Sequence, residues 1–179
     1  MKTKSTCFLM ILLMFIAVSV NAQRRAESGK NYNGLNLGIG IGGYYGYAAY
    51  NNRALPVFTI NYEFGVARNF TLAPFATFYT YQADHYRESV IPIGAKGTYY
   101  FDDLLDAGSS WDFYLAGSVG FVLVNSTWDT DYNGDKTYYN KTGPLFLDLH
   151  IGTEYHVNNK IGLFLDFSTG VSTVGLAIH

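Results

Sequence analysis

The sequence predicts an all-β fold: an eight-stranded antiparallel up-and-down transmembrane β-barrel that follows a cleaved signal peptide. Two observations carry this prediction. From Leu35 to the end of the sequence, apolar residues alternate with small or polar ones, which is the period of a strand with one apolar face. The apolar face is almost free of charge while the opposite face carries charged residues, the reverse of a soluble barrel.

Residues 1–22 are predicted to be the signal peptide. Lys2 and Lys4 precede an apolar run from Cys7 to Val20, and the small residue Ala22 follows at the expected cleavage point. The run is shorter than the ~20 residues of a spanning helix, and no later stretch approaches that length. Cleavage would leave a polar leader over residues 23–32 and a mature chain without cysteine.

The barrel is predicted to occupy residues 33–179 as one domain. Strands are expected at about 33–44, 55–66, 70–81, 90–101 and 111–125, in a segment ending near Val157, in a segment containing 161–167, and at about 171–178. In the third strand aromatic residues occupy both faces; we predict that Leu72, Ala76 and Phe78 face outward. Pro74 in this strand removes one ladder hydrogen bond.

The connections are expected to alternate in length. Tight turns are predicted at residues 67–69 and 158–159, and a polar connection at 102–110. The connections after the first, third and fifth strands are predicted to be long. Short periplasmic turns and longer external loops are typical of outer-membrane barrels. Side chains fill the interior of an eight-stranded barrel, so a pore of porin width is not expected.

Three groups of residues carry a family resemblance: 91–94 leading to 98–101, 113–117 leading to 119–121, and the closing 170–173. On these segments the mature chain resembles the small outer-membrane β-barrel domain family of Gram-negative bacteria, which includes OmpA- and OmpX-like proteins. The resemblance implies an eight-stranded barrel in the outer membrane, in contact with its lipids. It also implies insertion by the barrel assembly machinery and, for many members, no enzymatic activity.

Charged residues on the inward face form the first candidate site: Glu63, Lys96, Asp148, His150, Glu154 and Asp166. In a narrow lumen such groups must be paired or hydrated, which predicts a network that plugs the barrel. The functional alternative is a small gated conduit in which Lys96 changes partners among the acids. Because acids outnumber bases, a bound cation is compatible with this lumen.

Two further candidates lie in the predicted loops. Aromatic residues suited to surface binding or to an interface girdle are Tyr44, Tyr45, Tyr47, Trp128 and Tyr132. A candidate calcium site comprises Asp129, Asp131, Asn133 and Asp135, which follow the first half of the EF-hand pattern. Asn140 stands where that pattern has glutamate, so a plain turn is favoured, and no other cofactor is expected.

The sequence therefore predicts a non-catalytic barrel with a structural or surface-binding role. Two alternatives remain. One is a barrel enzyme acting on lipid or peptide at the outer leaflet, centred on His85 with Asp84 and Ser89 nearby. The other is a soluble, lipocalin-like periplasmic carrier. The mildly acidic mature chain makes nucleic acid an unlikely partner, since binding it usually needs a basic face.

Overall fold

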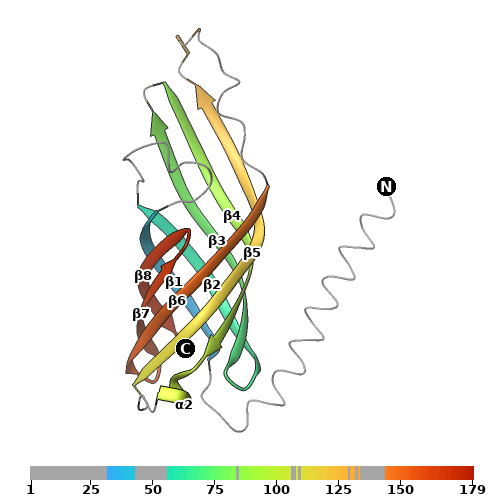
Figure 1. The fold of residues 1–179 in the computed structure, drawn as a ribbon. Coiled ribbons are helices and arrows are strands. Elements are labelled where there is room, and N and C mark those ends of the chain that lie inside the picture. The colour runs from blue at the N-terminus through green and yellow to red at the C-terminus, as the bar shows by residue number, and fades with distance from the viewer. Residues whose placement is uncertain are drawn as a thin grey trace, which may run out of the picture.

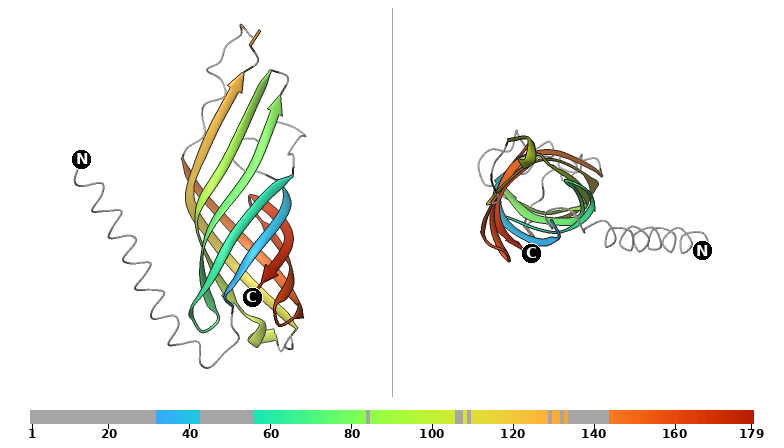
Figure 2. Two further views of the ribbon diagram at one scale, coloured as in Figure 1. Left: turned by 180° about the vertical axis from the view of Figure 1, so that it is seen from behind. Right: turned by 90° about the horizontal axis from the view of Figure 1, so that it is seen from below.

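The computed structural model describes residues 32–42, 56–83, 85–105, 108, 110–128, 130–131, 133 and 144–179. These residues form a closed antiparallel barrel of eight strands in chain order, which confirms the predicted fold class (Figures 1 and 2). The predicted signal peptide lies outside the described residues, as does the leader apart from Tyr32. The elements are β1 (Gly34–Gly42), β2 (Val57–Ala67), β3 (Phe70–Ala83), β4 (Tyr86–Tyr100), α2 (Asp102–Leu105), β5 (Trp111–Trp128), β6 (Leu145–Asn158), β7 (Ile161–Ser168) and β8 (Val171–Ile178).

The first and last strands close the barrel. β1 pairs with β2 on one side and with β8 on the other, where Leu37 lies opposite Leu176. Seen from below, the strands form a ring (Figure 2). A closed ring leaves no free edge in the wall, so the backbone groups of the barrel can satisfy one another without water.

Alternation along each strand separates an apolar outside from a polar inside. On β6, Leu147 and Leu149 are 60% and 68% exposed, whereas Asp148 between them is 4% exposed. The same outward exposure holds for a belt around the barrel that includes Ile39, Phe58, Ile60, Leu115, Val119, Phe121, Leu163 and Phe167. This apolar belt is that of a transmembrane barrel and excludes a soluble carrier, whose outer face would be polar.

The predicted facing of the third strand is confirmed. Leu72 and Phe78 are exposed on the outside, and Ala73 and Thr77 are buried inside. The β2–β3 register runs to the pair Asn61–Phe75 and resumes at Phe64–Leu72. Pro74 therefore lies where that ladder is interrupted, as expected for a residue without a backbone N–H.

Two predicted tight turns are present and have local causes. Asn69 adopts a positive φ of 59°, a conformation that asparagine tolerates better than most residues. In the β6–β7 turn, Oδ1 of Asn158 accepts hydrogen bonds from the backbone N–H groups of Lys160 at 2.8 Å and Ile161 at 3.0 Å.

Two predicted details are wrong. The β3–β4 connection is only two residues long, because β3 continues to Ala83 and β4 already begins at Tyr86. Trp128 ends β5 instead of lying in a loop, because β5 remains paired with β4 up to that residue. The polar connection predicted after β4 is present, and it contains the short helix α2.

The ends of β3, β4 and β5 rise beyond the other strands as a three-stranded projecting sheet, defined as residues 79–83, 86–90 and 123–128 (Figure 1). In the described registers, β2 pairs with β3 only up to Phe78, and β6 pairs with β5 only up to Phe121. The projecting sheet is therefore connected to the barrel by the continuation of β3, β4 and β5 into the barrel wall.

Two groups of buried side chains close the lumen toward its ends. Where the projecting sheet meets the barrel lies an apolar plug composed of Val57, Tyr79, Val90, Val122, Phe146 and Val171. Toward the opposite end lies a tyrosine stack, in which the rings of Tyr32 and Tyr100 are parallel at 4.1 Å and Tyr114 meets Tyr100 edge-on at 5.8 Å. The charged residues lie in the lumen between and beside these groups.

Candidate functional site

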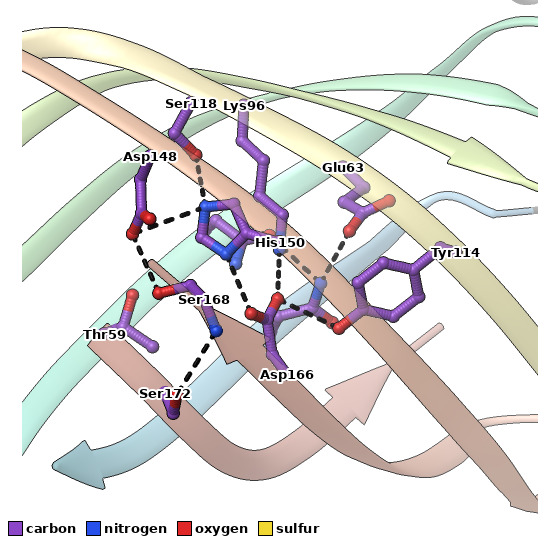
Figure 3. A network of polar contacts seen from close by, with 12 residues as sticks. Thr59, Glu63, Lys96, Tyr114, Ser118, Asp148, His150, Asp166, Ser168 and Ser172 are labelled. Carbon is purple, nitrogen blue, oxygen red and sulfur yellow. Dashed lines mark hydrogen bonds and ion pairs between the residues drawn. The ribbon is translucent and has the colours of Figure 1, made fainter. Parts of the chain in front are cut away.

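Asp166 on β7 is the centre of the charged lumen (Figure 3). One carboxylate oxygen accepts hydrogen bonds from Lys96 Nζ at 2.7 Å and from the Tyr114 hydroxyl at 3.0 Å. The other oxygen lies 2.8 Å from Nδ1 of His150. Lys96 also lies over the Tyr114 ring, 5.2 Å from its centroid. Four strands thus meet at one carboxylate, and the lysine charge is offset within the lumen.

Asp148 stabilises the β7–β8 turn through hydrogen bonds. Its oxygens accept hydrogen bonds from the Ser168 hydroxyl at 2.9 Å, the Thr169 hydroxyl at 2.7 Å and the Gly170 backbone N–H at 2.9 Å. His150 links this carboxylate to Asp166, because its Nε2 lies 3.7 Å from Asp148 and 2.9 Å from the Ser118 hydroxyl. These contacts indicate a structural role for Asp148.

Glu63 on β2 is held by neutral donors. Its carboxylate accepts hydrogen bonds from the Thr71 hydroxyl at 2.6 Å, the Tyr100 hydroxyl at 2.7 Å and the Asn36 amide at 3.0 Å. Three donors can stabilise an ionised carboxylate without a cation beside it. Glu63 therefore belongs to a hydrogen-bonded group separate from the Lys96–Asp166 pair.

Glu154 on β6 has partners that the sequence reasoning did not assign to the site. Its Oε1 lies 2.6 Å from Nε2 of His179 and 3.7 Å from Nδ1 of His156, and the other nitrogen of His156 lies 2.7 Å from Asp112. The alternation of inward and outward side chains along the strands is a signal that could have identified His156 and His179. His156 shares the inward parity of Asp148 and Glu154 along β6, and His179 continues that of β8. The hydrogen bond to Glu154 raises the pKa of the His179 imidazole.

The lumen has little free space. The space open to water molecules amounts to about 40 Å³ and is lined by residues of the network together with Phe75, Phe146 and Phe164. One water occupies about 10–15 Å³ on this measure, so there is room for a few waters. Between the apolar plug and the tyrosine stack, the described side chains fill the barrel as predicted for eight strands.

Acids exceed bases inside the barrel. Among the described inward residues, five carboxylates are buried, and Lys96 is the single buried lysine or arginine; the carboxylates belong to Glu63, Asp112, Asp148, Glu154 and Asp166. The three inward histidines, which are His150, His156 and His179, each contact a carboxylate. The interior is thus suited to holding positive charge.

Most residues of the two predicted loop sites lie outside the described residues: Tyr44, Tyr45, Tyr47, Asp129, Tyr132 and Asp135. Asp131 and Asn133 are described and exposed, and Trp128 is partly exposed at the tip of the projecting sheet.

The two described residues of the enzymatic alternative, His85 and Ser89, do not lie within hydrogen-bond reach of each other. His85 is exposed in the β3–β4 turn, and Asp84 lies outside the described residues. Three strand residues separate His85 from Ser89, and each adds about 3.3 Å along the strand. Ser89 therefore lies beyond hydrogen-bond reach of the His85 ring.

Among the described residues, no helix is both long and apolar enough to cross a membrane. Neither the family models nor the curated proteins searched gave a match to this sequence. Solved structures do match. Neisserial surface protein A is similar at 16% identity with a TM-score of 0.50, covering 82% of this chain and 92% of that one. The chain has the fold of the small outer-membrane barrels.

Two other solved structures are also similar. A de novo designed transmembrane β-barrel shares 10% identity at a TM-score of 0.49, covering 83% of this chain and 96% of that one. Ail, the attachment invasion locus protein of Yersinia pestis, shares 6% identity at a TM-score of 0.46, covering 83% of this chain and 95% of that one.

Proposed function

We propose that the protein is a non-catalytic barrel of a Gram-negative outer membrane, in which a filled lumen makes a rigid anchor for a ligand-binding surface at the projecting end. The observation that carries this proposal is the filled lumen. With about 40 Å³ of free space inside, the barrel is not a conduit for solutes, and contact with other molecules falls to its outer surfaces.

The projecting sheet supports a binding role. In the described registers, residues 80–83 of β3 and residues 123–125 of β5 are paired only with β4. Strand edges present N–H and C=O groups that can add an extended segment of another chain. A surface ligand that docks as an added strand would therefore find its template in the projecting sheet.

The orientation follows from the connections. The two longest connections, residues 43–56 and 129–144, join strands at the projecting end, whereas the turns at residues 68–69 and 159–160 at the opposite end are short. Long external loops and short periplasmic turns are typical of outer-membrane barrels. The projecting sheet would then stand outside the cell, with outer-membrane lipids around the apolar belt. Insertion would proceed through the barrel assembly machinery, as for other barrels of this fold.

Cysteine labelling tests location and orientation together. Cys7 is the only cysteine of the sequence, so a mature chain cleaved after residue 22 offers a background without thiols. We expect a membrane-impermeant maleimide to label Asp131→Cys on intact cells, and to label the matched variant Lys160→Cys only after the outer membrane is opened. Both positions are exposed. Labelling of Lys160→Cys alone on intact cells would contradict the orientation.

Conductance and binding test the role. Protein inserted in a planar bilayer should give no steady porin-like current, whereas a porin control should. Cells that express the intact barrel should bind to some members of a panel of immobilised secreted proteins, and a variant lacking residues 81–88 should lose that binding. An outer-membrane lipid profile that changes with the wild type but not with His85→Ala would instead support an enzyme.

A further inference from the structure

Three potential metal-binding side chains converge at the end of the barrel opposite the projecting sheet. Glu154 and His156 lie on β6, and His179 follows β8. One ligand atom from each lies within 4.8 Å of the other two. This cluster is separate from the Lys96–Asp166 pair and has no part in the proposed surface binding.

Each of the two imidazoles is oriented by an oxygen acceptor on its far side. Nε2 of His156 lies 2.7 Å from the Asp112 carboxylate, which leaves Nδ1 turned toward Glu154 Oε1 at 3.7 Å. Nδ1 of His179 lies 3.3 Å from the carbonyl oxygen of Asn33, which leaves Nε2 turned toward the same Glu154 oxygen at 2.6 Å. Metal-binding histidines are characteristically held in this way, by a carboxylate or a backbone carbonyl on the nitrogen that does not bind the metal.

The position of the Glu154 carboxylate depends on Gly162. Gly162 lies on β7 opposite His156, and a Cβ at this position would overlap Oε1 of Glu154. The absence of a side chain at residue 162 therefore makes the space that the carboxylate occupies between the two rings. The centroids of the two rings are 5.1 Å apart.

We propose that Glu154, His156 and His179 bind one Zn²⁺ ion, with Asp112 and the Asn33 carbonyl orienting the two imidazoles. Two histidines and one carboxylate suit zinc, whereas calcium and magnesium prefer sites made of oxygen ligands. Ligand atoms at about 2.0–2.1 Å from a tetrahedral zinc lie roughly 3.3 Å from one another. The separations of 2.6 and 3.7 Å from Glu154 lie on either side of that value, so small side-chain movements admit the ion. A water completes the fourth position.

The ion would join parts of the wall that are not neighbours in the sheet. Glu154 and His156 belong to β6, and β7 lies between β6 and β8, which His179 follows. Zinc would therefore tie the end of the last strand to β6 across β7, next to the β1–β8 closure.

Direct titration tests the site. The full chain, purified from membranes in detergent without a polyhistidine tag and stripped with EDTA, is titrated with Zn²⁺ in competition with a chromophoric chelator. We expect one Zn²⁺ per chain and at least tenfold weaker binding for His179→Gln, His156→Gln and Glu154→Gln. Asp112→Asn should weaken binding about 10–100-fold, the usual effect of losing a partner of a metal ligand.

Two matched variants separate the site from general effects. His85→Gln removes an exposed imidazole from the opposite end of the barrel and should leave zinc affinity unchanged. Gly162→Ala keeps every ligand but fills the space of the Glu154 carboxylate, and should weaken binding as much as a ligand substitution. A heat-dependent shift in gel mobility verifies that each variant is folded. His179 lies outside the strands, so its substitution leaves the ladders in place.

Substitution by Co²⁺ reports the geometry. The intense visible absorption of tetrahedral Co²⁺ is expected from the wild type and should be lost in His179→Gln. The proposal is overturned if the wild type shows no saturable zinc binding, or if folded His179→Gln binds zinc as tightly as the wild type. An octahedral Co²⁺ spectrum would equally overturn it, as would loss of affinity in His85→Gln.

Discussion

Asp166→Asn is the most informative perturbation of the lumen, because this carboxylate receives three donors. The substitution keeps the shape of the side chain and removes its charge. Lys96, whose ammonium lies 2.7 Å from Asp166, would keep its charge inside the barrel and lose its counter-ion. His150 and Tyr114 would each lose an ionised acceptor.

The contacts set the magnitude. Removing one partner of a buried ion pair costs about 3–5 kcal/mol, because the remaining charge is left uncompensated. Lys96→Met is expected to cost less, since Asp166 keeps His150 and Tyr114 as donors. In the Lys96→Met background, Asp166→Asn removes only those two hydrogen bonds, at a cost of roughly 1–3 kcal/mol. The two substitutions should therefore couple by about 2 kcal/mol.

The assay is unfolding of the barrel in micelles by guanidinium, followed by tryptophan fluorescence, since the chain contains two tryptophans. The four chains of the double-mutant cycle are compared with Asp131→Asn, which alters an exposed carboxylate and should leave the unfolding free energy within about 0.5 kcal/mol of the wild type. A cost below about 1 kcal/mol for Asp166→Asn, or a coupling near zero, would refute the argument that this pair is a desolvated ion pair.

Three other substitutions test the wall, a turn and the interior with the same assay. Leu149→Arg puts a charge on the lipid face of β6 and should cost up to about 2–4 kcal/mol, whereas Leu149→Ala should cost less. Asn69→Val should cost about 1–3 kcal/mol because of the positive φ, while Asn69→Gly should be nearly neutral; equal effects would refute a backbone origin. Gly152→Val should destabilise by about 1–3 kcal/mol, since its Cβ would overlap the Tyr114 ring, and an unchanged midpoint would contradict that packing.

Much of the barrel could be predicted because alternation is a local property. Leu147, Asp148 and Leu149 reveal their faces without any knowledge of neighbouring strands, since successive side chains on a strand point to opposite sides. The same parity placed all six predicted charged residues inward. The same alternation places His156 and His179 inward, but only their contacts with Asp112 and Glu154 identify them as part of the site.

Strand length was predicted less well because it depends on pairing. The sequence around Asp84 and His85 is polar and predicts a long loop, but β3 and β4 pair almost to that point and leave a two-residue turn. Trp128 likewise belongs to β5 because β4 supplies a partner at Tyr86. A polar segment becomes a strand or a loop according to what lies beside it.

The sequence by itself determined the fold class and the face on which each strand residue lies, because both follow from a two-residue period that each strand carries independently. Only the tertiary structure decided which inward groups meet. Lys96 and Asp166 are 70 residues apart in sequence, and they form an ion pair because barrel closure brings β4 and β7 to face each other across a lumen narrow enough for side chains to span.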